Sequence, residues 1–183
     1  MNLLVFSDLH GHFSLPSESP DLIFLLGDNT PWDIQQILKF YDCPIFGVLG
    51  KNDFPTDYDN TRIINVHGKT VKWNGITIAG WGGCPSTTNK RMHYTEEETT
   101  LFMEQLPHVD IFISHAGPAS FTSDIPNTNP GFQTFDKHTN KITCWFHGNL
   151  HFPSTYKIYN TTFHSVYPSI TLPNLTTKVP LGI

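Results

Sequence analysis

Cysteine is scarce in this sequence, and the few cysteines present are not arranged as disulfide or metal motifs. The 183 residues contain 3 cysteines, Cys43, Cys84 and Cys144, with no CxxC spacing among them. A secreted protein that depends on disulfide bonds has a denser and more regular cysteine pattern. Two of the three lie in or beside apolar runs, so we expect buried, reduced thiols in a cytoplasmic protein.

Charged residues are also sparse, and no part of the chain is strongly basic. Asp, Glu, Lys and Arg make up 15% of the residues, and the formal net charge is -5 at pH 7. Stable binding of duplex nucleic acid needs a cluster or stripe of Lys and Arg that neutralises phosphates, and the sequence has none. We therefore expect no stable duplex nucleic-acid binding, whereas a small phosphorylated substrate held by metal is compatible with this composition.

Long apolar runs and an N-terminal targeting pattern are missing as well. No stretch approaches the roughly 20 apolar residues that a transmembrane helix needs. The first apolar run ends at Asp8, with no basic region before it and no small-residue cleavage site after it. We expect no membrane association, and the sequence leaves open whether the chain forms homo-oligomers.

The sequence does have enough apolar material for one packed core. Hydrophobic residues make up 38% of the chain and aromatic residues 13%. A chain of this length buries roughly 70% of the surface that it exposes when unfolded. We therefore predict a single domain that spans residues 1–183.

One pattern recurs along the chain: an apolar run that ends in Asp, Asn or His next to a glycine. It occurs first as LLVFSDLHGH at residues 3–12, and again at residues 21–29, 44–53, 109–118 and 142–151. Short apolar runs of this kind are typical of buried strands. Packing demands nothing of the residue just past a strand, so the repetition indicates a shared chemical role for the strand ends.

The first of these strand ends has the spacing of a metal-binding pair. Residues two apart on a strand share a face, so Asp8 and His10 can point into one site as ligands of one metal ion. An isolated Asp-x-His is also common by chance at a polar strand end. The other four runs favour the metal-binding interpretation.

A helix is predicted between the second and third strands. Residues 32–41 have apolar side chains at helical spacing, and Pro31 and Asp33 supply a start signal. The order strand, helix, strand predicts a right-handed parallel crossover. In such a sheet, ligands gather at the carboxyl ends of the strands.

Three further segments are predicted from local patterns. Thr95 and Glu98 have the spacing of a capping box, for a helix that ends at Leu106. The short strands between residues 62 and 83 predict a hairpin region of a second sheet layer. Residues 119–140 are rich in Thr, Asn, Pro and Gly, and predict a long loop over the site.

In their order along the chain, the motifs resemble the signature of the calcineurin-like metallophosphoesterases. That family has the blocks DxH, GD, GNHD or GNHE, H and GHxH. The corresponding residues here are Asp8-x-His10, Gly27-Asp28, Gly50-Lys51-Asn52-Asp53, His115 and Gly148-Asn149-Leu150-His151. The resemblance spans nearly the whole chain. It implies an α/β fold, a four-layer α/β/β/α sandwich of two mixed sheets flanked by helices, with the site at the strand ends.

The resemblance also implies two divalent metal ions and a phosphoesterase activity. By position, the residues that resemble ligands of the first ion are Asp8, His10, Asp28 and His151. Those that resemble ligands of the second ion are Asp28 as a bridge, Asn52, His115 and Asn149. Imidazole together with carboxylate and amide oxygens suits Mn, Fe, Zn or Ni. Such a pair of ions clamps a phosphate and lowers the pKa of a bridging water, so that hydroxide attacks in line. We expect hydrolysis of a phosphodiester, in preference to a small phosphomonoester.

The chain departs from the family's pattern at two places. In an ungapped match, the block GKND has Lys51 at the position of the family's liganding Asn. Because Lys is a cation and a poor neighbour for a metal ion, we favour a shift of one residue, which keeps Asn52 as the ligand. The family's histidine, which stabilises phosphate or protonates the leaving group, is then missing. His12 and Asn52 are the candidates for its catalytic role. Asn149 replaces the first His of GHxH, and because an amide is a weaker ligand than imidazole, we expect loose binding of the second ion.

Two other interpretations stay open. The missing histidine and Asn149 are also compatible with a weakly active or inactive protein of the same fold that binds phosphate or a nucleotide. The polar strand ends can instead be structural, without any metal. The latter is disfavoured because clustered acids and imidazoles without a cation leave unpaired charge, which is costly.

Overall fold

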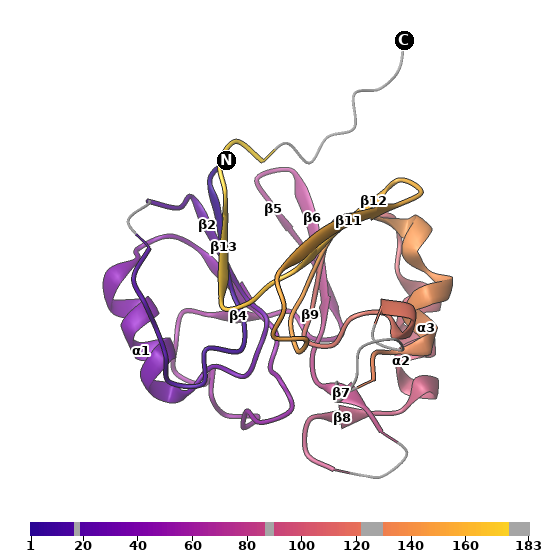
Figure 1. Ribbon diagram of the computed structural model, residues 1–183, viewed down its shortest axis with the longest axis horizontal. Helices are drawn as coiled ribbons and strands as arrows, with labels where there is room; N and C mark the ends of the chain where they lie inside the picture. The colour runs from indigo at the N-terminus through magenta and orange to yellow at the C-terminus, as the bar shows by residue number, and fades with distance from the viewer. Residues whose placement is uncertain (17–18, 87–89, 122–129, 176–183) are drawn as a thin grey trace.

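The computed structural model describes residues 1–16, 19–86, 90–121 and 130–175, and it contains two β-sheets that lie between helices (Figure 1). The strand order of the first sheet is β13-β1-β2-β3-β4. Its strands are β1 (Leu3–Phe6), β2 (Leu22–Leu25), β3 (Ile45–Gly47), β4 (Ile64–Asn65) and β13 (Ser169–Leu172). Strands β1 to β4 are parallel, and β13 pairs with β1 in the antiparallel direction, so this sheet is mixed.

The second sheet is also mixed, with the strand order β11-β12-β10-β9-β6-β5. Its strands are β5 (Lys69–Trp73), β6 (Ile76–Trp81), β9 (Val109–Ser114), β10 (Ile142–His147), β11 (Ser154–Ile158) and β12 (Thr161–Ser165). The four inner strands are parallel, and the two outer ones are antiparallel to their neighbours. A separate pair, β7 (Cys84–Pro85) and β8 (His93–Tyr94), lies beyond this sheet.

Helices cover the outer faces of the two sheets. Figure 1 shows α1 (Pro31–Phe40) on one side, with α2 (Glu96–Gln105) and α3 (Gln133–Lys137) on the other. Two short 3-10 helices, Ala119–Phe121 and Thr139–Lys141, flank α3. Among the described helices, none is long and apolar enough to cross a membrane. The predicted α/β fold, with two mixed sheets between flanking helices, is confirmed.

The apolar core has three parts, one at each contact between layers. Leu3 and Val5 of β1 belong to the cluster between the sheets, whereas Leu4 and Phe6 belong to the cluster under α1. This alternation is the two-residue period of a strand that is buried on both faces. Trp145 of β10 belongs to the third cluster, which lies under α2 and α3. Each fully buried large side chain of this kind contributes about 1.5–3 kcal/mol through removal of apolar surface from water.

Both predicted helix starts are confirmed by their caps. The Thr30 and Thr95 side chains accept hydrogen bonds from the backbone N–H groups of Asp33 and Glu98, respectively, at 3.3 and 3.1 Å. The carboxylates of Asp33 and Glu98 accept the reciprocal bonds from the Thr30 and Thr95 N–H groups, which completes a capping box at each helix. These caps satisfy backbone donors that a helix start otherwise leaves without partners.

Two sequence-based predictions about the connecting segments are wrong in part. Of the segment 62–83, only β5 and β6 form a hairpin of the second sheet, because β4 pairs with β3 in the first sheet. The segment 119–140 is not one long loop. Within its described part, Phe132 and Phe135 are fully buried, and this apolar pair holds α3 against the second sheet. Residues 122–129 lie outside the described residues.

Candidate metal centre

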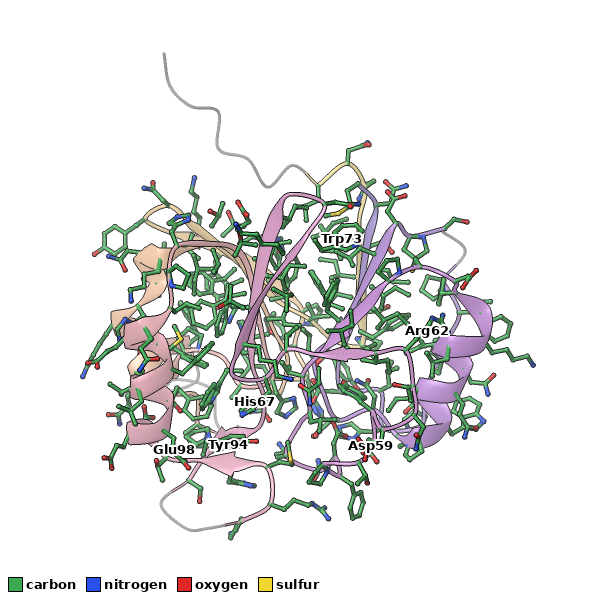
Figure 2. The ribbon with its side chains drawn as sticks, turned by 180° about the vertical axis from the view of Figure 1, so that it is seen from behind. Asp59, Arg62, His67, Trp73, Tyr94 and Glu98 are labelled. Atoms are coloured by element: carbon green, nitrogen blue, oxygen red, sulfur yellow. The ribbon has the colours of Figure 1, made fainter. Side chains whose placement is uncertain are left out.

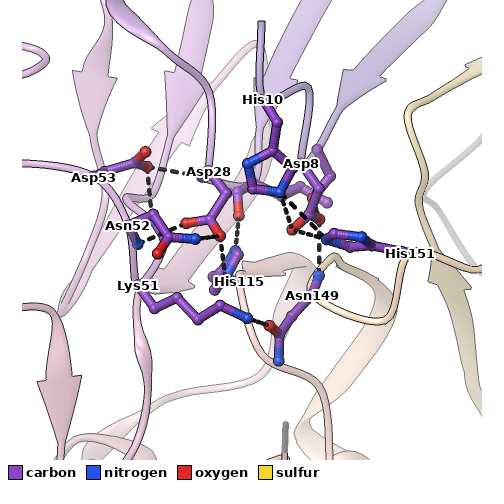
Figure 3. A network of polar contacts seen from close by, with 12 residues as sticks. Asp8, His10, Asp28, Lys51, Asn52, Asp53, His115, Asn149 and His151 are labelled. Carbon is purple, nitrogen blue, oxygen red and sulfur yellow. Dashed lines mark hydrogen bonds and ion pairs between the residues drawn. The ribbon is translucent and has the colours of Figure 1, made fainter. Parts of the chain in front are cut away.

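The parallel strands of both sheets end at one side of the molecule, and their loops are joined by hydrogen bonds. Asp8 N–H donates to the Gly27 carbonyl at 3.0 Å, which links the loops after β1 and β2. His115 Nδ1 donates to the Leu26 carbonyl at 2.8 Å, which ties the loop after β9 to the first sheet. The sequence motifs that are farthest apart in the chain therefore meet in one place (Figure 3).

An unusual backbone conformation marks the residues that meet there. Five of them have positive φ angles although they are not glycine: Asp8 (54°), His10 (48°), Asp28 (54°), Asn149 (66°) and His151 (51°). Asp and Asn tolerate this left-handed region better than most residues, but such conformations still cost on the order of 1–3 kcal/mol each. Strain of this kind concentrates at functional sites, where the surrounding structure holds it in place.

Close approach of the loops requires glycine at Gly148. A Cβ atom there would overlap Ser7 Oγ and would lie 2.6 Å from Asp8 Oδ2. No rotation of a side chain on Gly148 relieves this overlap, because the Cβ position is fixed by the backbone. The loop after β10 therefore packs directly on the Asp8 carboxylate.

One group of side chains that can hold a metal ion consists of Asp8, His10 and His151, whose ligand atoms all lie within 4.8 Å of one another. The Asp8 Oδ1 atom is 3.2 Å from His151 Nε2 and 4.0 Å from His10 Nε2, and the two imidazole nitrogens are 3.3 Å apart. Asp8 is buried, whereas both imidazoles are exposed at the rim. A carboxylate and two imidazoles that face one point form a suitable ligand set for a divalent transition metal.

A second group, Asp8, Asp28 and His115, is fully buried beneath the first. His115 Nε2 lies 3.7 Å from Asp28 Oδ2 and has no hydrogen-bond partner among the described residues. Because His115 Nδ1 donates its proton to the Leu26 carbonyl, Nε2 is the nitrogen that has a free lone pair in the neutral ring. Backbone fixation of one ring nitrogen is the usual way in which a ligand histidine is oriented.

The charges of this region act strongly on one another. Burial opposes ionisation of Asp8, but hydrogen bonds from His151, Ser7 and the Asn149 backbone, with the nearby His115, lower the pKa of Asp8 to about 2. Burial also opposes charge on His115, yet the Cys84 side chain and the carboxylates of Asp8 and Asp28 raise its pKa to about 10. Cys84 and the two carboxylates together therefore favour a positive charge on the buried His115 ring.

Asn52 and Asp53 hold the Asp28 loop in place. The Asn52 backbone N–H donates to Asp28 Oδ1 at 2.9 Å, and its side-chain Nδ2 donates to Asp28 Oδ2 at 2.6 Å. Asp53 Oδ2 accepts from the backbone N–H groups of Asp28 and Gly50 at 2.8 and 2.7 Å. Burial, with the Asp28 charge, raises the pKa of Asp53 to about 6 although the hydrogen bonds oppose this. Asp53 was not among the residues predicted for the site, although it ends the GKND block.

Asn149 is within reach of the centre, but its oxygen already has a partner. The Asn149 backbone N–H donates to Asp8 Oδ2 at 2.8 Å, and its Oδ1 accepts a 2.7 Å hydrogen bond from Lys51 Nζ. Its Nδ2 is buried without a hydrogen-bond partner in the part of the chain that the structure describes. The contact between Lys51 and Asn149 was not predicted from the sequence, because a cation is a poor neighbour for a metal ion.

His12 lies apart from this network. It is exposed, and its backbone N–H donates to the Leu9 carbonyl at 2.8 Å. No contact between its side chain and the cluster is found among the described residues. Of the eight residues predicted for the site, the structure joins Asp8, His10, Asp28, Asn52, His115, Asn149 and His151 by hydrogen bonds or ion pairs and leaves His12 outside.

His67 and Tyr94 form an aromatic pair beside the second sheet. The His67 ring stacks on Tyr94, with centroids 4.5 Å apart, and His67 Nδ1 accepts from the Gly82 N–H at 2.9 Å. Burial lowers the pKa of His67 to about 4, so the ring stays neutral and can accept this bond. Figure 2 shows His67 and Tyr94 near each other at one end of the molecule, with Trp73 at the opposite end.

Comparison with known proteins identifies the fold. No protein-family model matches the sequence, and no curated protein matches it. The structure of phosphopantetheinyl hydrolase (PptH) from Mycobacterium tuberculosis matches 98% of this chain and 98% of its own, with a TM-score of 0.62 and 17% identity. A Staphylococcus aureus protein assigned as a 5'-nucleotidase matches 90% of this chain, with a TM-score of 0.56 and 14% identity. This chain spans only 48% of that second protein.

A hypothetical protein from Thermus thermophilus is similar in the same way, with a TM-score of 0.51 and 10% identity over 90% of this chain. Identities this low establish the fold alone. With the clustered Asp and His residues at the strand ends, they show that the chain has the calcineurin-like metallophosphoesterase fold. The fold predicted from the sequence motifs is therefore confirmed.

Proposed function

We propose that the protein is a metal-dependent phosphoesterase that hydrolyses a phosphodiester in preference to a small phosphomonoester. The observation that carries this proposal is the convergence of Asp8, His10 and His151 on one point, with Asp28 beside them at the base. The names of the two similar structures, a phosphopantetheinyl hydrolase and an assigned 5'-nucleotidase, support a hydrolase of this class.

The residues of the first group fit a divalent cation by their chemistry. Carboxylate and imidazole ligands suit Mn, Fe, Zn or Ni, and manganese is the ion that we propose for the first tests. Beneath this group, the buried His115 Nε2 lies 3.7 Å from Asp28 Oδ2, so the base of the centre is polar as well. When bound, such an ion polarises a phosphoryl group and lowers the pKa of a coordinated water.

The protein holds these ligands rigidly before any substrate arrives. The Ser7 hydroxyl and the Asn149 backbone N–H both donate to Asp8 Oδ2, which leaves Oδ1 on the side of the imidazoles. Asn52 fixes both oxygens of Asp28. Preorganised ligands lower the cost of binding and orient a phosphate ester for in-line attack.

The exposure of the rim supports a substrate that approaches from solvent. The side chains of His10 and His151 are 36% and 44% exposed, whereas those of Asp8 and Asp28 are 0% exposed. An incoming phosphate therefore meets the imidazoles first and the carboxylates lie behind them. The imidazole of His151 also stacks on Tyr167, with centroids 4.9 Å apart, which limits its motion.

The test is hydrolysis of bis-p-nitrophenyl phosphate and p-nitrophenyl phosphate in the presence of Mn2+. We expect turnover of the diester to exceed that of the monoester, and we expect Asp8→Asn to lower turnover at least about 100-fold. Asp110→Asn is the matched control, because Asp110 also accepts a backbone hydrogen bond, from Thr77, but lies at the start of β9 and away from the strand ends. Equal loss in both variants, or no loss in Asp8→Asn, would contradict the proposal.

The alternative is a protein of the same fold that binds phosphate or a nucleotide without turnover. The contact between Lys51 and Asn149 favours it, because it places a fixed positive charge where the resemblance implies a metal ligand. Tight binding of a nucleotide by folded, Mn2+-loaded protein, without hydrolysis of any ester, would establish this alternative.

A further inference from the structure

The second half of the centre already contains a cation, the ammonium group of Lys51. Its Nζ donates a 2.7 Å hydrogen bond to Asn149 Oδ1, and Figure 3 shows the Lys51 side chain reaching Asn149 past Asn52 and Asp28. An ammonium group can only donate, so the atom of Asn149 that faces it is the oxygen. This oxygen is the atom that a metal ion at the second position would need from Asn149.

Asn52, the other amide that the resemblance implies as a ligand there, is bound to the Asp28 carboxylate. Its backbone N–H and its side-chain Nδ2 both donate to the Asp28 carboxylate, at 2.9 and 2.6 Å. An amide binds a metal ion through its oxygen, and an Asp28 carboxylate that accepts both bonds has fewer lone pairs left for bridging two ions. His115 and the shared carboxylates then remain as the protein ligands on this side. The two amides that the resemblance implies as ligands of a second ion, Asn149 and Asn52, are therefore both engaged in hydrogen bonds.

The two departures from the motifs lie side by side in the fold. Lys51 and Asn149 are 98 residues apart in the sequence, and the fold brings their side chains into direct contact. Lys51 places an ammonium group where an ungapped match of the motif has an amide. Asn149 places an amide oxygen where this ammonium group can donate to it. An ammonium and a dication in the same small space repel each other strongly, so the two exclude one another.

We propose that the centre holds one divalent cation, at Asp8, His10, Asp28 and His151, and that the Lys51 ammonium replaces a second ion and binds a phosphate oxygen of the substrate. The inference rests on the proposed function, because it concerns how the same centre binds a phosphate ester. Lys51 Nζ has two further N–H groups beyond the one that it donates to Asn149. A lysine ammonium is a common phosphate-binding group.

The test is the number of Mn2+ ions that each chain binds. Protein stripped with a chelator is titrated with Mn2+ by calorimetry, and the loaded protein is examined by elemental analysis and by electron paramagnetic resonance. We expect one Mn2+ per chain and the hyperfine spectrum of an isolated ion. Two Mn2+ per chain with a spin-coupled spectrum would overturn the inference.

A double variant tests whether the Lys51–Asn149 pair is what excludes the second ion. Lys51→Asn with Asn149→His supplies an amide oxygen and an imidazole, so we expect two Mn2+ per chain and a spin-coupled spectrum. Lys157→Asn, on an exposed position of β11, is the matched control and keeps one ion. A folded double variant that still binds one ion contradicts the inference. If the double variant does not fold, the stoichiometry of the unchanged protein decides.

Hydrolysis of bis-p-nitrophenyl phosphate by the same samples separates this inference from the proposed function. Two ions together with turnover contradict the single-ion centre and leave the phosphoesterase proposal standing. One ion without turnover supports the ion count and contradicts the phosphoesterase proposal. Protein that binds no Mn2+ and hydrolyses nothing contradicts both.

Discussion

Replacement of Asp53 by asparagine is predicted to stabilise the protein at neutral and alkaline pH. Asp53 is 6% exposed, and its Oδ2 accepts two backbone hydrogen bonds that an amide oxygen can also accept. Burial and the Asp28 charge raise its pKa from the ordinary 3.8 to about 6. Between about pH 4 and about pH 6, Asp53 therefore keeps its proton in the folded state, whereas the unfolded state has already released it.

The size and sign of the effect follow from this difference. A rise of about 2 in pKa corresponds to about 3 kcal/mol in the free energy of unfolding. The protein loses this stability as pH rises from below 3.8 through about 6. At about pH 4.5 only about 1 kcal/mol of this has been lost, because folded Asp53 is still protonated there. Asp53→Asn removes the loss, so its advantage over the unchanged protein should grow by about 2 kcal/mol between about pH 4.5 and about pH 8.

Urea unfolding of both proteins at several pH values, with a chelator present, measures this difference. The titration of other groups cancels, because it is common to the two proteins. Asp57→Asn is the control: Asp57 also accepts a backbone N–H, from Phe54 at 2.8 Å, but it is only half-buried. An advantage of Asp53→Asn that is absent at alkaline pH, or that does not change with pH, would refute the reasoning.

Three further predictions concern the centre itself. Gly148→Ala places a methyl group on Ser7 and the Asp8 carboxylate, so Mn2+ affinity measured by calorimetry should fall at least about 10-fold; unchanged affinity would show that the loops are not tightly packed. His151→Ala removes an imidazole ligand, and Mn2+ affinity should fall roughly 10- to 100-fold or more, with no change if His151 is not a ligand. Lys51→Gln should lower kcat/KM for the diester about 100-fold, whereas Lys51→Arg should retain part of the activity because it keeps the positive charge. Equal kcat/KM values in the two variants would exclude a role for the charge.

Much of the fold was predictable because its signals are local. The apolar runs that became β1, β2, β9 and β10 are buried on both faces, and continuous hydrophobicity is their expected signature. The capping boxes at Thr30 and Thr95 are also local. Strand β4 was assigned to the wrong sheet because its pairing partner is not encoded locally. Helix α3 was missed because five residues are too few for a helical period to stand out.

Most of the candidate site was predictable for a different reason. Residues that follow parallel strands meet at one edge of a sheet, so the positions of Asp8, Asp28 and His115 follow from the strand pattern and the family's motifs. The hydrogen-bond partners of each side chain could not be predicted from these patterns. The direction of the Lys51 side chain, and the Asn52 amide that donates to Asp28, depend on loop conformations that no periodicity encodes. The positive φ angles at the strand ends have the same origin.

We propose that the strand ends of the two sheets together form a divalent-cation centre for hydrolysis of phosphate esters. Its most direct test is the rate of bis-p-nitrophenyl phosphate hydrolysis as Mn2+ is returned to metal-free protein. We predict a rate that is negligible without metal, rises with Mn2+ and saturates as the centre fills. Folded protein that binds Mn2+ at these residues and hydrolyses neither this diester nor p-nitrophenyl phosphate would contradict the account.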